Sequence, residues 1–291
     1  MSEVIASPST RRKALERGVD LDTRARELGR TTLGPEDLSA AAPAASTGDT
    51  SYWDVDHSAY GPVSQEPMSR FAQVAARNLG AANALIPQVT HHDRADVSAV
   101  EALRKAWRAE AQARGVKLTA LAFHVMALAR CLRDFPRFNA ALTPDGKTLV
   151  FKDYVHIGIA VDTLHGLMVP VIRDADRKGL WEISAAITDL ATRAQARKVA
   201  PDEMGGASMT ISNLGGIGGL GFTPIVNPPE LAILGITRTE TVTLWDGDTP
   251  RPVPMVPLDL SYDHRVINGA DAGRFMRRYT GLIEEPEDIM T

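Results

Sequence analysis

The stretch Leu258–Gly273, which reads Leu-Asp-Leu-Ser-Tyr-Asp-His-Arg-Val-Ile-Asn-Gly-Ala-Asp-Ala-Gly, decides the fold of the C-terminal half. Its first part alternates leucine and tyrosine with aspartate and serine, which predicts a half-buried strand. From Ala270 to Ile283, apolar residues recur at helical spacing. His264 therefore stands on a turn between a strand and a helix, where both elements can hold it rigidly. Such a turn is a suitable place for a general base.

Each residue of this turn also has a purely structural explanation. A single histidine is more often a hydrogen-bonded structural residue than a catalyst. Asn268 is a preferred N-cap for the helix that follows, and Gly269 can supply an unusual backbone conformation. The turn alone leaves both explanations open.

Several stretches resemble, in order, the acyltransferase core component of 2-oxo-acid dehydrogenase complexes. Asp263–Gly269 is similar to the family's Asp-His-Arg-x-x-Asp-Gly signature, whose wider His-x-x-x-Asp-Gly form is shared with chloramphenicol acetyltransferase. Gly158–Ile172, Thr210–Gly215 and Phe222–Glu230 carry the resemblance further, so that it covers about residues 65–289. The resemblance implies an α+β, chloramphenicol-acetyltransferase-like catalytic domain with a large mixed sheet. The order of elements agrees, since helices dominate the first half and strands the second.

The resemblance implies transfer of an acyl group between dihydrolipoyl-lysine and coenzyme A, and likeness to bacterial pyruvate-type members implies acetyl. His264 matches the family's catalytic base, and Ser212 matches the hydroxyl that stabilises the oxyanion. Asn268 stands where the family usually has Asp, so it keeps hydrogen-bonding capacity without the charge. Ser212 could instead be a strand hydroxyl bonded to backbone. The family builds its site between the subunits of a homotrimer, which can assemble into a larger cubic core.

Other functions stay open. The acyl group could be of the branched-chain, acetoin or succinyl type. A catalytically silent core or scaffold subunit is a second alternative, which Asn268 favours. An acyltransferase that acts on a free small-molecule acceptor is a third.

The N-terminal residues 1–38 predict a small helical unit. Ser7-Pro8-Ser9 favours a helix start near Thr10 and Gly18 its end, and a second helix is predicted from Pro35. A unit this short has little core, and composition alone would also allow a disordered arm.

The same residues are similar to the family's peripheral-subunit-binding domain. That resemblance implies docking of the decarboxylase or the dihydrolipoamide dehydrogenase component through Arg11 and Arg12. An Ala/Pro/Ser linker at residues 39–50 then leads to a catalytic domain predicted at residues 51–291. The chain has no Asp-Lys dipeptide of the kind that carries lipoate, so the lipoyl group is expected from another domain or protein. Its Met-Ser-Glu start favours a naturally short chain.

Composition excludes several classes of protein. A net charge of −4 argues against nucleic acid as the main partner. The single cysteine, Cys131, lies in an apolar pattern and fits a reducing compartment. The N-terminus resembles no signal peptide, and no run reaches the roughly 20 apolar residues of a membrane helix. These features predict a soluble cytoplasmic protein.

Two further motifs are considered and set aside. Residues 216–221 satisfy Gly-x-Gly-x-x-Gly, but the prolines that follow cannot extend the helix of a dinucleotide site, so a close approach of backbone is favoured. His91-His92 lacks a second ligand pair at zinc spacing, so no metal is predicted and a strand end is favoured. Periodicity predicts helices at 69–84, 96–114, 118–133 and 181–198, and strands at 149–152, 155–161, 168–172, 209–214, 232–237, 241–245 and 255–262.

Overall fold

The structure is a computed structural model of the whole chain, and it describes residues 4–17, 19–28, 30–38, 53–164 and 166–290. Contacts between residues divide the chain into two units, residues 1–66 and residues 67–291. The predicted linker at residues 39–50 and the predicted helix end at Gly18 lie outside the described residues. The two units are described separately.

The N-terminal unit consists of short elements. Ser7 caps its first helix as predicted, because its hydroxyl accepts the N–H of Thr10 at 3.1 Å. The prediction of a helix from Pro35 is wrong, since the chain forms a single 3₁₀ turn there. A helix after Asp20 was not predicted, because its short polar sequence shows little apolar periodicity. The elements are β1 (Ile5–Ala6), α1 (Pro8–Arg17), α2 (Leu21–Leu28), β2 (Thr32–Leu33), η1 (Pro35–Leu38) and η3 (His57–Tyr60).

The second unit is built on a mixed sheet of eight strands in the described part of the chain. Strand β9 runs parallel to its neighbours β6 and β10, and the other pairs are antiparallel. The strands are β3 (Gln88–Asp96), β6 (Ile157–Thr163), β7 (Gly166–Met168), β8 (Val171–Ile172), β9 (Met209–Asn213), β10 (Ala232–Ile236), β11 (Glu240–Asp246) and β12 (Thr249–Asp263). A separate ribbon pairs β4 (Ala140–Leu142) with β5 (Leu149–Phe151). The predicted α+β class with a large mixed sheet is confirmed.

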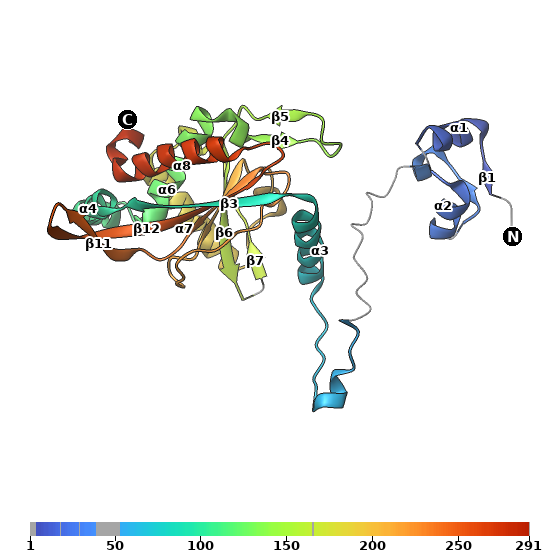
Figure 1. Cartoon of the computed structure of the whole chain (residues 1–291), viewed down its shortest axis with the longest axis horizontal. Helices are drawn as coiled ribbons and strands as arrows, with labels where there is room; N and C mark the ends of the chain where they lie inside the picture. The colour runs from blue at the N-terminus through green and yellow to red at the C-terminus, as the bar shows by residue number, and fades with distance from the viewer. Residues whose placement is uncertain (1–3, 18, 29, 39–52, 165, 291) are drawn as a thin grey trace. The chain divides into compact units, whose positions relative to one another are not determined.

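Helices cover one face of this sheet and bury its apolar side chains (Figure 1). Ile211 of β9 and Leu260 of β12 are fully buried in this core, together with Phe123 and Phe275 of the helices. The helices of this unit are α3 (Arg70–Leu85), α4 (Ser98–Ala106), α5 (Arg108–Ala113), α6 (Ala120–Asp134), α7 (Leu180–Gln195) and α8 (Gly269–Glu284). Short 3₁₀ turns are η4 (Pro136–Asn139), η5 (Ala175–Arg177), η6 (Pro201–Glu203) and η7 (Pro286–Ile289). Within the described ranges, every helix is too short or too polar to span a bilayer.

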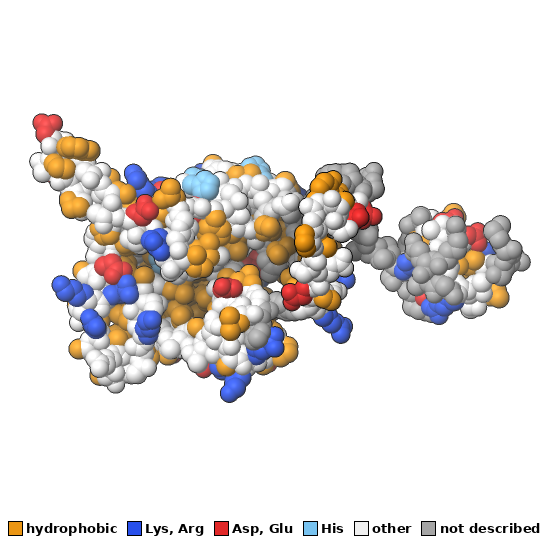
Figure 2. Space-filling model, turned by 90° about the horizontal axis from the view of Figure 1, so that it is seen from below, with side chains coloured by type: hydrophobic (Ala, Val, Ile, Leu, Met, Phe, Trp, Pro, Cys, Tyr) orange, Lys and Arg blue, Asp and Glu red, His pale blue; other side chains and the backbone are white. Residues whose placement is uncertain are grey.

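The opposite face of the sheet is more polar. Residues that alternate with the core positions, such as Asp259 and Ser261 of β12, point to it. A small apolar cluster joins Ala82 and Ile86 of α3 to Val226 there. Figure 2 shows hydrophobic side chains gathered in a hollowed central area of one surface of the molecule, with charged side chains around them.

Three predicted elements have the wrong bounds. The helix predicted at 96–114 is divided at Trp107, whose ring packs 6.0 Å from that of Trp181. The strand predicted at 168–172 is broken at Pro170, which lacks the N–H that a ladder needs. Strand β12 begins before its predicted start at 255, although prolines alternate there. Because they occupy every second position, their missing N–H groups can all lie on one edge, while the other edge pairs with β11.

Candidate active site

His264 lies on the turn that joins β12 to α8, at the strand-to-helix junction that the sequence predicts. The N–H of Ile267 donates to the carbonyl of Asp263 at 3.0 Å, and the N–H of His264 donates to the carbonyl of Pro87 at 3.1 Å. The side chain of His264 itself is exposed. The backbone is therefore fixed while the imidazole faces solvent, which is the arrangement that a general base needs.

Asp263 and Arg265 hold the turn from either side of the histidine. The Asp263 carboxylate is only 1% exposed. It accepts the backbone N–H of Arg265 at 3.0 Å and the Nη2 of its guanidinium at 2.6 Å. These bonds raise the pKa of Arg265 above its ordinary value. A charged pair joined through both backbone and side chain resists rotation of the turn.

Asn268 is the N-cap of α8. Its side-chain oxygen accepts the N–H of Asp271 at 2.8 Å, which satisfies one of the unpaired donors of the first helical turn. An Asn forms this bond as well as an Asp does. The replacement of the family's usual Asp therefore leaves the geometry of the turn intact.

Ser212 lies in the middle of the sheet, where β9 pairs with Ala160 of β6 and with Gly235 of β10. Its side chain is half-buried. In the part of the chain that the structure describes, no hydrogen bond engages its hydroxyl. The structural alternative, a strand hydroxyl bonded to backbone, is thus not observed, and the hydroxyl is available to a ligand.

Ser212 and His264 do not meet within one chain. Ser212 pairs with Gly235, and Gly235 pairs with Asp259 of β12, so Ser212 is level with Asp259 and two strands away from it. His264 follows Asp263, the last residue of β12. Two strand spacings of about 4.8 Å and four residues of about 3.3 Å rise separate Ser212 from Asp263 by roughly 16 Å. A site that uses both side chains therefore needs a second copy of the chain.

Glu230 is a buried carboxyl on the same face of the sheet, and it was not predicted. Its Oε1 accepts the hydroxyl of Thr210 at 3.0 Å, and its Oε2 is buried without a partner among the described residues. Burial raises the pKa of Glu230 to about 7, and the nearby ammonium of Lys152 opposes this only weakly. Thr210 precedes Ser212 by two residues, so both point to one face. The signal in the sequence was a carboxyl directly before the apolar run that starts at Leu231.

The glycine-rich segment after β9 forms no helix, so the Gly-x-Gly-x-x-Gly pattern is not that of a dinucleotide site. Gly218 and Gly219 have φ angles of 129° and 98°, which favour glycine. A Cβ on Gly221 would lie 3.2 Å from the Asp259 carboxylate. The predicted close approach of backbone to another part of the protein is therefore confirmed for this residue.

The prediction that His91-His92 ends a strand is wrong. Both histidines lie in the middle of β3, and they point to opposite faces because they are neighbours in a strand. Among the described residues, no group of three or more His, Cys, Asp or Glu side chains is placed to hold a metal ion.

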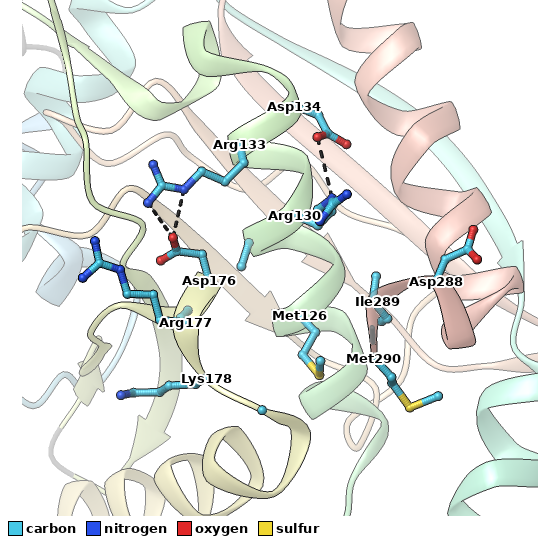
Figure 3. Close-up of a pocket in the computed structure, with 13 residues that line it drawn as sticks. Met126, Arg130, Arg133, Asp134, Asp176, Arg177, Lys178, Asp288, Ile289 and Met290 are labelled. Carbon is cyan, nitrogen blue, oxygen red and sulfur yellow. Dashed lines mark hydrogen bonds and ion pairs between the residues drawn. The ribbon is translucent and has the colours of Figure 1, made fainter.

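A pocket of about 420 Å³ lies away from these residues, between α6, η5 and η7 (Figure 3). Arg133 donates to the carboxylate of Asp176 at 2.9 Å on its wall, and Arg130 faces Asp134. Most of its charge is thus balanced internally. Neither Ser212 nor His264 lines it.

In the N-terminal unit, Arg11 and Arg12 are exposed on α1. The Arg11 guanidinium donates to the carbonyl of Val4 at 2.8 Å and to that of Ala6 at 3.2 Å. Arg11 therefore stabilises its own unit by tying the chain before α1 to the helix.

The chain resembles known proteins over most of its length. The model of the 2-oxoacid dehydrogenases acyltransferase family (catalytic domain) matches residues 60–291. The dihydrolipoyllysine-residue acetyltransferase component of the pyruvate dehydrogenase complex from Pseudomonas aeruginosa is 49% identical over 237 residues, which are 81% of this chain and 43% of that protein. The chain spans about half the length of the curated relatives it matches first.

Two solved structures are similar to the second unit. The cubic core of a pyruvate dehydrogenase multienzyme complex matches with a TM-score of 0.80 and 47% identity, covering 81% of this chain and 98% of that one. The Azotobacter vinelandii dihydrolipoamide acetyltransferase matches with a TM-score of 0.80 and 46% identity over the same shares of the two chains. The work on that enzyme concerns the role of one serine, one histidine and one asparagine in its catalytic mechanism. The chain belongs to the 2-oxoacid dehydrogenase acyltransferase family through its catalytic domain.

Proposed function

We propose that this chain transfers an acetyl group between dihydrolipoyl-lysine and coenzyme A as the core component of a 2-oxo-acid dehydrogenase complex. The observation that carries the proposal is the rigid turn that exposes the His264 imidazole. The spacing of the site residues supports it. His264 follows Ser212 by 52 positions and Asn268 follows His264 by four, the same separations as the serine, histidine and asparagine studied in the Azotobacter vinelandii enzyme.

The reaction starts at a thiol, either of dihydrolipoamide or of coenzyme A. A thiol with an ordinary pKa near about 8.5 is mostly protonated at neutral pH. The neutral His264 imidazole takes the thiol proton while the sulfur attacks the thioester carbonyl. The Ser212 hydroxyl donates a hydrogen bond to the oxyanion of the tetrahedral intermediate. When the intermediate collapses, the imidazolium returns the proton to the leaving thiolate.

The site is assembled from two copies of the chain, His264 from one and Ser212 from its neighbour. The separation of these residues within one chain supports this arrangement. A closed ring of such heterologous contacts is a homotrimer in its simplest form for this family. Larger assembly, as in the cubic core of the similar complex, is part of the proposal.

Acetyl transfer from acetyl-CoA to free dihydrolipoamide tests the reaction. We expect His264→Ala to abolish transfer and Ser212→Ala to lower kcat by about 10²–10³, the usual loss for one oxyanion donor. His91→Ala, on the opposite face of β3, is the matched control and should leave the rate unchanged. Wild-type transfer to a chloramphenicol-like alcohol alone would favour a free acceptor, and no transfer from several acyl-CoA donors would favour a scaffold. Longer donors distinguish branched-chain, acetoin and succinyl types.

Mixing the two inactive variants tests the shared site. When His264→Ala and Ser212→Ala chains are unfolded together and reassembled at equal amounts, about a quarter of the interfaces combine an intact histidine with an intact serine. We therefore expect about a quarter of the wild-type activity per site. A mixture that stays inactive, although each variant assembles, would place both residues in one chain and contradict the proposal.

The N-terminal unit is proposed to dock the decarboxylase or the dihydrolipoamide dehydrogenase component through Arg11 and Arg12. Because Arg11 also bonds to Val4 and Ala6, its replacement would weaken the unit itself. Arg12→Glu is the cleaner variant, and it should reduce co-purification with the partner component while acetyl transfer to free dihydrolipoamide is unchanged. Unchanged co-purification would remove Arg12 from the docking surface.

A further inference from the structure

A row of paired residues crosses the polar face of the sheet at the level of Ser212. Ser212 of β9 pairs with Gly235 of β10, Gly235 with Asp259 of β12, and Asp259 with His92 of β3. Residues that pair directly in neighbouring strands point to the same face, with their Cβ atoms about 5 Å apart. The side chains of Ser212, Asp259 and His92 therefore share one face, and the missing side chain of Gly235 leaves a gap in the row.

The ring of Phe222 fills this gap. A Cβ on Gly235 would lie 2.8 Å from the nearest ring carbon of Phe222 and 3.1 Å from the Cβ of Asp259. Only glycine lets the ring approach the sheet so closely. The ring consequently lies between Ser212 and Asp259, about one strand spacing from the proposed oxyanion donor.

Asp259 holds Phe222 in this place. Its carboxylate is 2% exposed, and its Oδ2 accepts the backbone N–H of Phe222 at 3.0 Å. Its Oδ1 lies 2.6 Å from Nδ1 of His92, whose side chain is 59% exposed. A carboxylate removed from water needs such donors, and here each oxygen has one. One side chain thus joins β3 to the end of the glycine-rich segment, residues 215–221.

We propose that Asp259, oriented by His92, is a positioning residue for acyl transfer, because it holds the Phe222 ring and the end of the glycine-rich segment beside Ser212. The inference rests on the proposed function, since the affected barrier is that of thioester exchange. Asp259 touches no substrate in this account, and it acts through Phe222.

Asp259→Asn is the informative variant. The carboxylate accepts from two donors, but an Asn amide has a single oxygen and presents an NH₂ group to the second donor. One of the two bonds must therefore break while the volume of the side chain is kept. We expect kcat to fall by about tenfold, which is the scale of one lost hydrogen bond to a charged group, with KM for coenzyme A within about twofold. His92→Ala keeps the bond to Phe222 and should cost about threefold.

A double-mutant cycle separates positioning from general damage. If Asp259 acts through the surroundings of Ser212, then Asp259→Asn should cost less than about twofold in a Ser212→Ala background. Damage to the fold would cost the same factor in both backgrounds. His91→Ala is again the control on the other face of β3. The same factor in both backgrounds, or a wild-type kcat in Asp259→Asn, would overturn the inference and leave the proposed function standing.

Hydrogen exchange gives a readout that needs no activity. In peptides that span residues 214–226, we expect faster amide exchange in Asp259→Asn than in wild type, with peptides of α6 unchanged. His91→Ala should exchange like wild type. If wild-type protein shows no acetyl transfer, the proposed function fails, and exchange still decides whether Asp259 positions the segment. Identical exchange in wild type and Asp259→Asn would refute the positioning role.

Discussion

Replacing Glu230 by glutamine is expected to change how the stability of the second unit depends on pH. Glu230 is 6% exposed, and burial raises its pKa from 4.5 to about 7. Because the folded protein binds the proton more tightly than the unfolded chain does, the stability that this group contributes is fully present below about pH 4.5. It is lost as the pH rises towards 7, where the folded protein must carry a buried carboxylate.

The size of this effect follows from the two pKa values. The difference between about 4.5 and about 7 corresponds to about 3 kcal/mol at high pH, of which about 2.5 kcal/mol falls between pH 5 and pH 8. Glutamine keeps the oxygen that accepts the Thr210 hydroxyl, and its amide has no titration. Any cost of burying that amide is the same at every pH, so it shifts the whole curve without changing its slope.

Urea unfolding at a fixed protein concentration measures this slope, because concentration must be held constant for a chain that self-associates. We expect the free energy of unfolding of Glu230→Gln, relative to wild type, to become more favourable by about 2–3 kcal/mol from pH 5 to pH 8. Glu285→Gln, at an exposed site, is the matched control and should follow wild type. Parallel curves for wild type and Glu230→Gln would refute the reasoning.

Three other outcomes follow from buried groups of the core. Burial lowers the pKa of His124, which bonds to the Tyr279 hydroxyl, to about 4, so wild type should lose stability as the pH falls from about 6.5 to 4. Urea unfolding of His124→Gln should show a shallower acid decline, and an equal decline would contradict this assignment. Burial raises the pKa of the Cys131 thiol to about 12, so iodoacetamide should modify it only in denaturant, as mass spectrometry would report. Gly158→Ala would place a Cβ 2.5 Å from the Thr210 hydroxyl, and a thermal melt should show destabilisation by about 1–3 kcal/mol.

The elements that sequence predicted well are those with strong periodicity. The alternation before His264 placed Leu258, Leu260 and Tyr262 in the core and Asp259, Ser261 and Asp263 on the other face, and the structure agrees. The strand-to-helix turn followed from the change of period at this point. Periodicity depends on the chain's own spacing, so it can be read without knowing the partners of each strand.

Errors arose where a distant contact overrides a local pattern. Trp107 divides a helical stretch because its ring packs on Trp181, which is far away in the sequence. The prolines before Met255 would normally exclude a strand, but they pair along a single edge with β11. His92 was assigned to a strand end, although β12 extends β3 over its whole length. Each of these outcomes depends on which strand or ring lies next to the residue, and local sequence does not contain that information.

The candidate site was only partly visible for the same reason. His264 and Ser212 were found through resemblance to a family, and Asn268 had both a capping and a turn-positioning explanation from the start. Asp259 and Glu230 drew no attention, because a carboxylate in an alternating strand is normally solvated. What makes them unusual is burial by the segment 214–231, which folds over the polar face of the sheet. The polar half of the alternation is therefore more than a solvent-facing surface: it carries buried carboxyls beside Ser212, and their partners come from three other parts of the chain.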